Sequence, residues 1–369
     1  MGKSNSKSIQ SSPSLSSISS VTSIPRLLKT HRQNKSSSSS ALTYFSSSSS
    51  TQLSLNSPNS LNSHLEIMSQ YPSSLNENLL NSDDFDICQY IGDRKYCKSG
   101  IEDVNYVYPV DDDEVDRCQM QHFLMKHIWE GNFSAPVEEL LSSYDTKILD
   151  IGCGSGAWIL EMATEYPRPQ FVGIDIVPLY PSEIHPTNVK FRQANVLTGL
   201  PFEDETFDFV YMRFMTFAFT INDWERAIKE ALRVTKKGGY VEIMETDFRW
   251  YNEGPFDKTS IGKFLQTQNM DLIASPLITK YLNKFSNSEI KHEERKIAIG
   301  EWGGKLGKLY RELYGWASRN LRKVITDSGI NDTNWDHTVE ICLKQLNELR
   351  AYDEIHRFWI VKSLETEEE

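Results

Sequence analysis

One stretch near the middle of the chain, KILDIGCGSGAWILEMA from Lys147, constrains the fold more than any other. Its first five residues are a short apolar run with β-branched positions, and its last seven repeat apolar positions at helical spacing. Gly152, Gly154 and Gly156 therefore lie on a strand-to-helix turn. Glycine suits such a turn because it tolerates positive φ and lets a ligand approach the backbone, beside free N–H groups at the helix start. The turn suits an adenosine-containing cofactor.

The chain alternates between strand and helix patterns after this turn. The predicted strands are 147–151, 170–176, 189–194, 207–213 and 239–246, and two more follow at 291–299 and 354–362. The predicted helices between them are 157–166 and 223–234. Strands that alternate with helical crossovers form a parallel sheet covered on both faces. The pattern therefore predicts an α/β fold with a Rossmann-like, seven-stranded and mostly parallel sheet.

Further helices are predicted on both sides of this core. Before it, one helix begins in the acidic turn 111–114, and a short helix follows at 137–142. The apolar face of the first helix is expected to be Val115, Met120, Phe123, Leu124, His127 and Ile128. After residue 247, the predicted helices are rich in aromatic residues and span 259–275, 306–328 and 335–352. We therefore interpret 84–369 as one domain with a core, 146–247, and a helical, aromatic lid with the closing strands, 248–369.

The first part of the chain has a different composition. Residues 1–65 contain no Asp or Glu, and Ser and Asn dominate the first 80 or so residues. So few apolar side chains cannot offset the entropy lost on folding, which predicts a disordered basic tail over 1–83. The 369-residue chain carries a formal net charge of −12, so its folded part is acidic, and we expect no nucleic-acid partner for that part.

The sequence also indicates a compartment. Its five cysteines are scattered without the spacing of a metal site, and no apolar run reaches the length of a membrane helix. We therefore expect a cytoplasmic protein that binds no metal. The start MGKSNS fits the N-myristoylation pattern at Gly2, and Arg26, Lys29, Arg32 and Lys35 form a basic patch that anionic lipid would attract. Contact of the tail with a membrane surface is thus one expectation, and an unmodified tail or a nuclear-import segment is the alternative.

Two acidic residues bear on the choice of cofactor. Gly152, Gly154 and Ala157 also satisfy the GxGxxG/A pattern of dinucleotide-binding turns, and Asp175 ends the next strand, where an acid holds ribose hydroxyls. Asp150, two positions before the first glycine, distinguishes between a dinucleotide and S-adenosylmethionine. A carboxylate there repels a pyrophosphate but favours the ammonium and sulfonium charges of S-adenosylmethionine. Electrostatics therefore favours S-adenosylmethionine over NAD.

Four motifs in order carry a family resemblance. They are DIGCGSG, FVGIDIVP, QANVLTGLPFEDETFDFVYMRF and EALRVTKKGGYVEI. Over roughly residues 146–247 the chain resembles class I S-adenosylmethionine-dependent methyltransferases with a type 11 or type 25 methyltransferase domain. The flanks YPVDDDEVDRCQMQH and DEIHRFWIVK are more weakly similar to fungal LaeA-like methyltransferases. The resemblance implies methyl transfer to an acceptor, a small molecule or a protein, that the sequence does not identify.

The resemblance implies a role for each residue of the glycine turn. Gly152, Gly154 and Gly156 would accommodate the methionine part of S-adenosylmethionine, and Asp150 would lie near its amino group. Asp175 would bind the ribose hydroxyls.

The later motifs imply the rest of the cofactor site. Ile176 would pack on the adenine. Asn195, which Val196 follows in the same motif, stands where the family usually has an Asp that faces the adenine amino group, and its side-chain oxygen can still accept that hydrogen bond. Arg213 and Phe214 would lie at the reactive end of the cofactor.

Methyl transfer demands little covalent chemistry from the protein. Much of the catalysis can come from alignment of the two reactants in a dry site, and a base is needed only if the acceptor must lose a proton. Glu245, Asp247, His292 and His356 are the candidate bases, and the sequence does not choose among them. Cys153 lacks a nearby His, so we interpret it as a small filler rather than a nucleophile.

Aromatic residues are the candidates for an acceptor pocket as a group, although core packing is the better explanation for any one of them. They are Phe214, Phe217, Phe219, Trp250, Tyr251, Trp302, Tyr310, Tyr314 and Trp316. The alternative function is a regulatory protein that keeps the fold and binds S-adenosylmethionine or a partner without turnover.

Overall fold

The computed structural model describes residues 88–97, 106–251, 269–327, 329 and 334–364. The predicted tail, with Gly2 and the basic patch at 26–35, lies outside the described residues. No helix in the described part of the chain is long and apolar enough to cross a membrane.

A seven-stranded sheet forms the core, in the order β5-β4-β3-β6-β7-β9-β8. Its parallel strands are β3 (Lys147–Ile151), β4 (Gln170–Asp175), β5 (Val189–Gln193), β6 (Phe207–Arg213) and β7 (Thr235–Tyr251). Beside β7 the sheet is completed by β9 (Tyr352–Val361), which is antiparallel to β7, and by β8 (Lys291–Ala298), which is antiparallel to β9 and so runs in the direction of the other strands. This topology confirms the predicted Rossmann-like, mostly parallel α/β fold.

The strand order places the glycine turn at a topological switch point. From β3 the chain proceeds to β4 and β5 on one side, and then returns to β6 and β7 on the other. Leu149 of β3 pairs with Val172 of β4 and with Val210 of β6. The connections after β3 and β6 therefore diverge, and ligands of open α/β sheets bind in the crevice between such connections.

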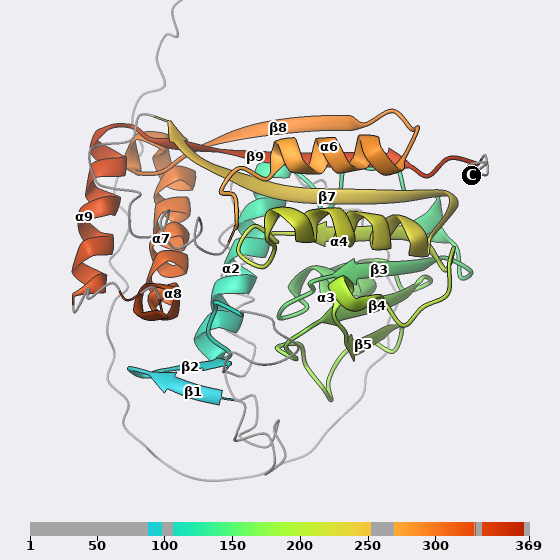
Figure 1. Ribbon diagram of the computed structural model, residues 1–369, viewed down its shortest axis with the longest axis horizontal. Helices are drawn as coiled ribbons and strands as arrows, with labels where there is room; N and C mark the ends of the chain where they lie inside the picture. The colour runs from blue at the N-terminus through green and yellow to red at the C-terminus, as the bar shows by residue number, and fades with distance from the viewer. Residues whose placement is uncertain (1–87, 98–105, 252–268, 328, 330–333, 365–369) are drawn as a thin grey trace, which may run out of the picture. The chain divides into compact units, whose positions relative to one another are not determined.

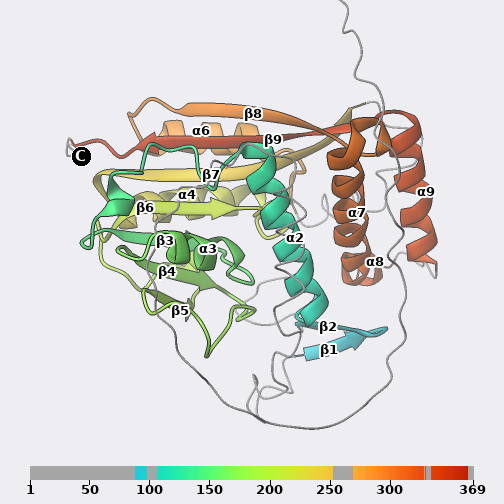
Figure 2. The same cartoon turned by 180° about the vertical axis from the view of Figure 1, so that it is seen from behind.

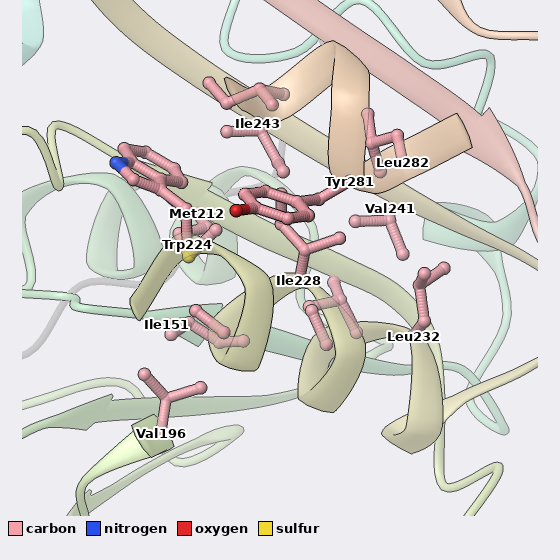
Figure 3. Packing of buried hydrophobic residues seen from close by; sticks show 14 of the residues in the cluster. Ile151, Val196, Met212, Trp224, Ile228, Leu232, Val241, Ile243, Tyr281 and Leu282 are labelled. Carbon is pink, nitrogen blue, oxygen red and sulfur yellow. The ribbon is translucent and has the colours of Figure 1, made fainter. Parts of the chain in front are cut away.

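Helices cover both faces of the sheet. On one face, α4 (Ile221–Val234) and α6 (Ser275–Phe285) run along the strands (Figure 1). Figure 3 shows Trp224 and Ile228 of α4 and Tyr281 of α6 packed over the sheet residues Met212 and Ile243. On the other face, α3 (Ala157–Glu165) buries Trp158, whose ring stacks on Tyr211 with the centroids 4.1 Å apart.

A long helix, α2 (Asp112–Trp129), also lies on the α3 side of the sheet (Figure 2). Asp111 caps its N-terminus by accepting the Glu114 N–H at 3.1 Å, and Asp111 also binds Arg94 through two hydrogen bonds of 2.6 and 2.8 Å. Arg94 belongs to a hairpin of β1 (Cys88–Ile91) and β2 (Arg94–Cys97). The acidic first turn predicted a helix start here, and the cap confirms it.

Three helices lie beyond the carboxyl ends of the parallel strands (Figures 1 and 2). They are α7 (Gly304–Asn320), α8 (Arg322–Asp327) and α9 (Trp335–Glu348). Short 3-10 turns occur at Leu140–Ser142, Val196–Thr198 and Glu301–Gly303. The end of the sheet that carries the glycine turn is thus the end that these helices flank.

Two predicted helices in the cap have the wrong bounds. The described end of the 259–275 helix, residues 269–274, is not helical, and α6 begins at Ser275 instead. Pro276 explains this start, because proline suits the first turn of a helix but interrupts its interior. The predicted helix 306–328 is interrupted at Leu321, which separates α7 from α8.

Candidate cofactor and acceptor site

The glycine turn after β3 has a left-handed backbone at three positions. The φ angles of Gly152, Gly154 and Gly156 are 70°, 54° and 78°. A Cβ on Gly152 would lie 2.6 Å from Sδ of Met215, and one on Gly156 would lie 3.0 Å from the ring of Phe191. A Cβ on Gly154 would meet no atom of the described residues within 4 Å. Two glycines therefore make room for protein neighbours, whereas the third faces open space.

That open space belongs to a cavity at the carboxyl edge of the parallel strands. The turns after four strands line it, at 152–155, 175–176, 194–197 and 213–219. The predicted site residues Gly152, Gly154, Asp175, Ile176, Asn195, Val196 and Arg213 all line it. The structure thus brings together residues from three separate motifs, at the ends of four strands.

Ser155 contributes a buried hydroxyl to this cavity. The residue is 6% exposed, and its Oγ has no hydrogen-bond partner among the described residues. A buried hydroxyl without a partner is unfavourable by about 1–3 kcal/mol. A polar ligand in the cavity would remove this penalty. The sequence analysis did not single out Ser155.

Asp175 holds the glycine turn through its carboxylate. One oxygen accepts the Gly154 N–H at 2.8 Å, and the other accepts the Val177 N–H at 3.0 Å. Burial raises the pKa of Asp175, and these N–H groups partly oppose the shift. Because a carboxylate has about four acceptor positions, Asp175 can still accept a hydroxyl group from a ligand in the cavity.

Asp150 lies beneath the cavity rather than in its lining. It is 1% exposed, and neither of its oxygens has a hydrogen-bond partner in the described part of the chain. Burial raises its pKa to about 7, while the charge of Arg213 lowers it and that of Asp175 raises it. Its carboxylate can therefore act on a ligand through charge, and a cation bound above it would favour its ionised form.

Two residues at the adenine end of the predicted site already make contacts within the chain. Asn195 Oδ1 accepts the Leu197 N–H at 2.9 Å and so caps the 3-10 turn that follows. Val196 is 7% exposed and packs in the core on the α4 side of the sheet. The Asn195 oxygen predicted to face an adenine amino group is therefore already an acceptor within the chain, although an amide oxygen can accept a second hydrogen bond.

Arg213 and Phe214 end β6 at the cavity. Arg213 Nη1 lies 3.2 Å from Nδ1 of His122, and its guanidinium lies 5.7 Å from the centre of the Phe214 ring. Phe214 has a φ of 58°, a left-handed conformation that is unfavourable for a residue with a side chain. Glu245 holds the turn that follows, because its Oε2 accepts the Met215 N–H at 2.6 Å.

The structure adds α2 residues that the sequence analysis missed. Glu114 and Arg117 line the cavity as a buried ion pair, with N–O distances of 2.8 to 3.0 Å. The predicted apolar face of α2 is partly wrong. Met120, Leu124 and Ile128 pack in a core cluster as predicted, but His127 is exposed and Phe123 only half-buried. Glu114, Arg117 and His122 are buried instead. Polar residues occupy the buried face because they satisfy one another. An acid and a base three positions apart in DDDEVDR were the available signal.

Of the four candidate bases, only Glu245 lines the cavity. It is 1% exposed, and burial raises its pKa to about 7. Asp247 instead binds Ser275 at the start of α6, and His356 lies 3.5 Å from Asp247 and 3.0 Å from His292. These three residues therefore form a separate cluster outside the described cavity lining.

Some of the remaining predicted residues line the cavity, and others do not. Cys153 lines the cavity, but burial raises its thiol pKa well above the usual value, which agrees with a filler rather than a nucleophile. Five of the nine aromatic candidates line the cavity, namely Phe214, Phe217, Phe219, Tyr310 and Tyr314. Trp302 is 42% exposed, and neither it nor Trp316 lines the described cavity. The side chains of Trp250 and Tyr251 lie outside the described residues.

The sheet order and the site at its switch point define a class I methyltransferase-type fold. Residues 148–239 match the family model of a methyltransferase domain, so the chain contains such a domain. S-adenosylmethionine is the cofactor that this domain indicates.

Two fungal proteins have sequences similar to this chain. The secondary metabolism regulator laeA of Coprinopsis cinerea is 26% identical over 280 residues, which cover 69% of this chain and 68% of that protein. Methyltransferase pytC of Aspergillus terreus is 30% identical over 225 residues, which cover 58% of this chain and 66% of that protein. Among solved structures, a putative sarcosine dimethylglycine methyltransferase from Galdieria sulphuraria has a TM-score of 0.39 at 16% identity, covering 66% of this chain and 98% of that one.

Proposed function

We propose that this protein is a methyltransferase that uses S-adenosylmethionine and transfers its methyl group to a separate acceptor molecule. The observation that carries the proposal is the open turn at Gly154, with the Asp175 carboxylate and the unpartnered Ser155 hydroxyl beside it. The match of residues 148–239 to a methyltransferase domain supports it.

The residues of the turn fit the charge of this cofactor. When bound, S-adenosylmethionine supplies a methyl group attached to a positively charged sulfur. Asp150 and Asp175 place two buried carboxylates on either side of the turn, and such a pair favours a cation over a pyrophosphate. Asp175 accepts hydroxyl groups, Ile176 offers an apolar surface, and Ser155 can donate or accept a hydrogen bond.

Glu245 is the proposed base for an acceptor that must lose a proton. Its pKa of about 7 suits proton transfer near neutral pH. It accepts N–H groups of Met215, Thr216 and Thr246, which hold the carboxylate at the cavity wall. Asp247, His292 and His356 keep structural roles at α6 and the outer strands.

A second function is favoured by the name of one relative. The laeA protein of Coprinopsis cinerea is described as a regulator of secondary metabolism. A regulatory protein on this fold would bind S-adenosylmethionine or a partner without turnover. The intact glycine turn fits both functions, so the two differ only in methyl transfer.

Turnover of labelled cofactor separates these functions. The intact chain is incubated with methyl-labelled S-adenosylmethionine and a fungal extract, and the label is followed into small molecules and protein. We expect transfer that Asp175→Ala strongly reduces. Binding of S-adenosylmethionine by calorimetry without any transfer would favour the regulatory function. Absence of binding would contradict the cofactor site itself.

We also propose a cytoplasmic protein whose N-terminal segment contacts a membrane surface, with the nucleus as the alternative. The proposal rests on the sequence alone, through Gly2 and the basic residues at 26–35. One acyl chain binds membranes weakly, and a polybasic patch is a suitable second signal.

A further inference from the structure

The cavity continues beyond the glycine turn into a second part with different walls. This part, here called the acceptor chamber, is lined by one side of α2 between residues 114 and 125, the turn after β6, the end of β7 and the inner side of α7. Its aromatic side chains are Tyr108, Phe214, Phe217, Phe248, Tyr310 and Tyr314.

Ring contacts make one wall of the acceptor chamber continuous. Tyr108 packs edge-on against Phe217, with the centroids 6.0 Å apart and an interplanar angle of 77°. Phe217 in turn packs against Phe248 at 5.3 Å and 61°. Ala317 and Leu313 of α7 add small and aliphatic surface to the chamber. A wall of this kind contacts a flat apolar molecule over much of its area.

Two arginines line the cavity: Arg213 lies at the predicted reactive end of the cofactor and is 3.2 Å from His122, whereas the charge of Arg117, in the acceptor chamber, is neutralised within the protein. Arg117 is 6% exposed and donates to both carboxylate oxygens of Glu114. Arg117 also donates to Gln121 at 3.0 Å and lies over the Tyr108 ring, 5.2 Å from its centre. Glu114 accepts a further hydrogen bond of 2.6 Å from Asn320. An anionic ligand would therefore compete with a buried partner that is already in place.

The Glu245 carboxylate of the acceptor chamber is also bound within the protein, by backbone N–H groups. Glu245 receives the N–H groups of residues 215, 216 and 246, at 2.6, 3.2 and 3.0 Å. Burial also raises its pKa, so that its charge is weakened near neutral pH. A cationic ligand would thus compete with Arg117 for Glu114 and with three backbone N–H groups for Glu245.

We propose that the acceptor chamber binds an uncharged aromatic small molecule as the methyl acceptor. The proposal rests on the methyltransferase function proposed above and names its substrate class. The proposal excludes a phosphorylated or carboxylated metabolite and the cationic side chain of a protein as the methyl acceptor. The basis is an apolar, ring-lined wall in which Glu114 and Arg117 are paired with each other and Glu245 is bound by the backbone.

Three probes with the same ring system test the charge preference. They are 2-naphthol, 2-naphthyl phosphate and 2-naphthylmethylamine, which are neutral, anionic and cationic at pH 7. Each is titrated calorimetrically into the intact chain saturated with S-adenosylhomocysteine. We expect the dissociation constant of 2-naphthol to be at least tenfold lower than those of the charged probes. Equal or tighter binding of a charged probe, or no binding of 2-naphthol, would overturn the proposal.

A pair of variants on α7 tests the location. Ala317→Phe fills the acceptor chamber and should weaken 2-naphthol binding at least tenfold. Glu312→Phe adds the same ring on the exposed side of the helix and should leave that binding within twofold. Both variants should bind S-adenosylmethionine within twofold of the wild type. If Ala317→Phe is unfolded by circular dichroism, Phe217→Leu takes its place, because it removes a ring from the wall described above.

The outcomes keep the two proposals apart. If S-adenosylmethionine does not bind the wild type, the proposed function fails regardless of the probes. If it binds but 2-naphthol does not, or if filling the acceptor chamber leaves 2-naphthol binding unchanged, only the assignment of the acceptor class fails.

Discussion

Arg213 Nη1 lies 3.2 Å from Nδ1 of His122, although 91 positions separate the two residues in the sequence. His122 Nε2 lies 2.7 Å from the Glu161 carboxylate. Burial lowers the pKa of His122 to about 4, so the ring is neutral near pH 7. A neutral ring can donate through Nε2 to Glu161 while Nδ1 accepts from Arg213. His122 thus links α3 to the end of β6, where Arg213 lies at the cavity.

Substitution of His122 should disturb this link. We expect His122→Ala to lower the free energy of unfolding by about 2 kcal/mol, because Glu161 and Arg213 each lose a hydrogen bond to the buried ring. Urea denaturation followed by circular dichroism measures the effect. His127→Ala is the matched control, since His127 is exposed on the same helix, and its effect should stay within about 0.5 kcal/mol. Equal effects of both variants would contradict the role of His122.

The glycine turn and the strands around it could be predicted because their signal is local. Gly152, Gly154 and Gly156 follow an apolar run and precede a helical one, and this spacing alone requires a strand-to-helix turn. The motif order then placed Asp175 and Arg213 at the ends of β4 and β6, the two strands that flank β3. Parallel strands bring their carboxyl ends to one edge, so the site followed from the fold.

The buried face of α2 could not be predicted in the same way. Periodicity of apolar residues identifies a helix but assumes that its polar residues face solvent. Glu114 is buried because Arg117 and Asn320 bind it, and Asn320 lies 206 positions away. Pairings over such separations leave no local pattern. The acceptor chamber depends on the same long-range contacts, so its lining was missed in part.

Asp150 should make stability depend on pH. Its pKa in the folded protein is about 7, above the ordinary value of 3.8. Between these values the unfolded chain ionises while the folded protein holds the proton, so stability falls as pH rises and the loss is complete above pH 7. Between pH 5 and pH 8 this group should lower the free energy of unfolding by roughly 3 kcal/mol.

Asp150→Asn isolates this contribution. Urea denaturation of both proteins at pH 5 and pH 8 should show a smaller loss of stability in the variant. Asp145→Asn is the control, because Asp145 is exposed, and it should follow the wild type at both pH values. The same Asp150 variant should bind S-adenosylmethionine more weakly. Identical pH dependence in wild type and variant would show that Asp150 is not the buried ionisable group inferred above.

Asp175→Ala should weaken S-adenosylmethionine binding ten- to hundredfold. A charge-assisted contact to hydroxyl groups contributes about 1.5–3 kcal/mol. Asp175 also holds the Gly154 N–H at 2.8 Å, so the variant loosens the turn as well as removing the ligand contact. Calorimetric titration measures the affinity, and Glu183→Ala, an exposed acid beyond the same strand, serves as the control. Unchanged affinity in Asp175→Ala would refute the cofactor site.

Gly2→Ala should abolish membrane recovery of the protein in cells. N-myristoylation requires a glycine at this position, and the basic residues Arg26, Lys29, Arg32 and Lys35 should strengthen the attachment by about 1 kcal/mol for each charge near anionic lipid. Fractionation of cells that express wild type and variant measures the distribution, and mass spectrometry of the N-terminal peptide detects the acyl group. A wholly soluble wild type without acyl mass would contradict the expectation.

Comparison of Gly154→Ala with Gly92→Ala should separate the effect on ligand binding from the effect of backbone strain on stability. Gly154 has a φ of 54°, and Gly92 in the β1–β2 turn has a φ of 67°. A Cβ on either residue would meet no atom of the described residues within 4 Å. Alanine at both positions should therefore lower the free energy of unfolding by about 1 kcal/mol, because left-handed backbone is unfavourable for a residue with a side chain.

The two variants should differ only in their affinity for S-adenosylmethionine. The methyl group at Gly154 enters the cavity, so we expect at least tenfold weaker binding of S-adenosylmethionine in Gly154→Ala. Gly92 does not line the cavity, and Gly92→Ala should keep the wild-type affinity. Calorimetry and urea denaturation of the two variants give both quantities. If Gly154→Ala binds the cofactor as tightly as Gly92→Ala, the open space over the glycine turn does not receive S-adenosylmethionine.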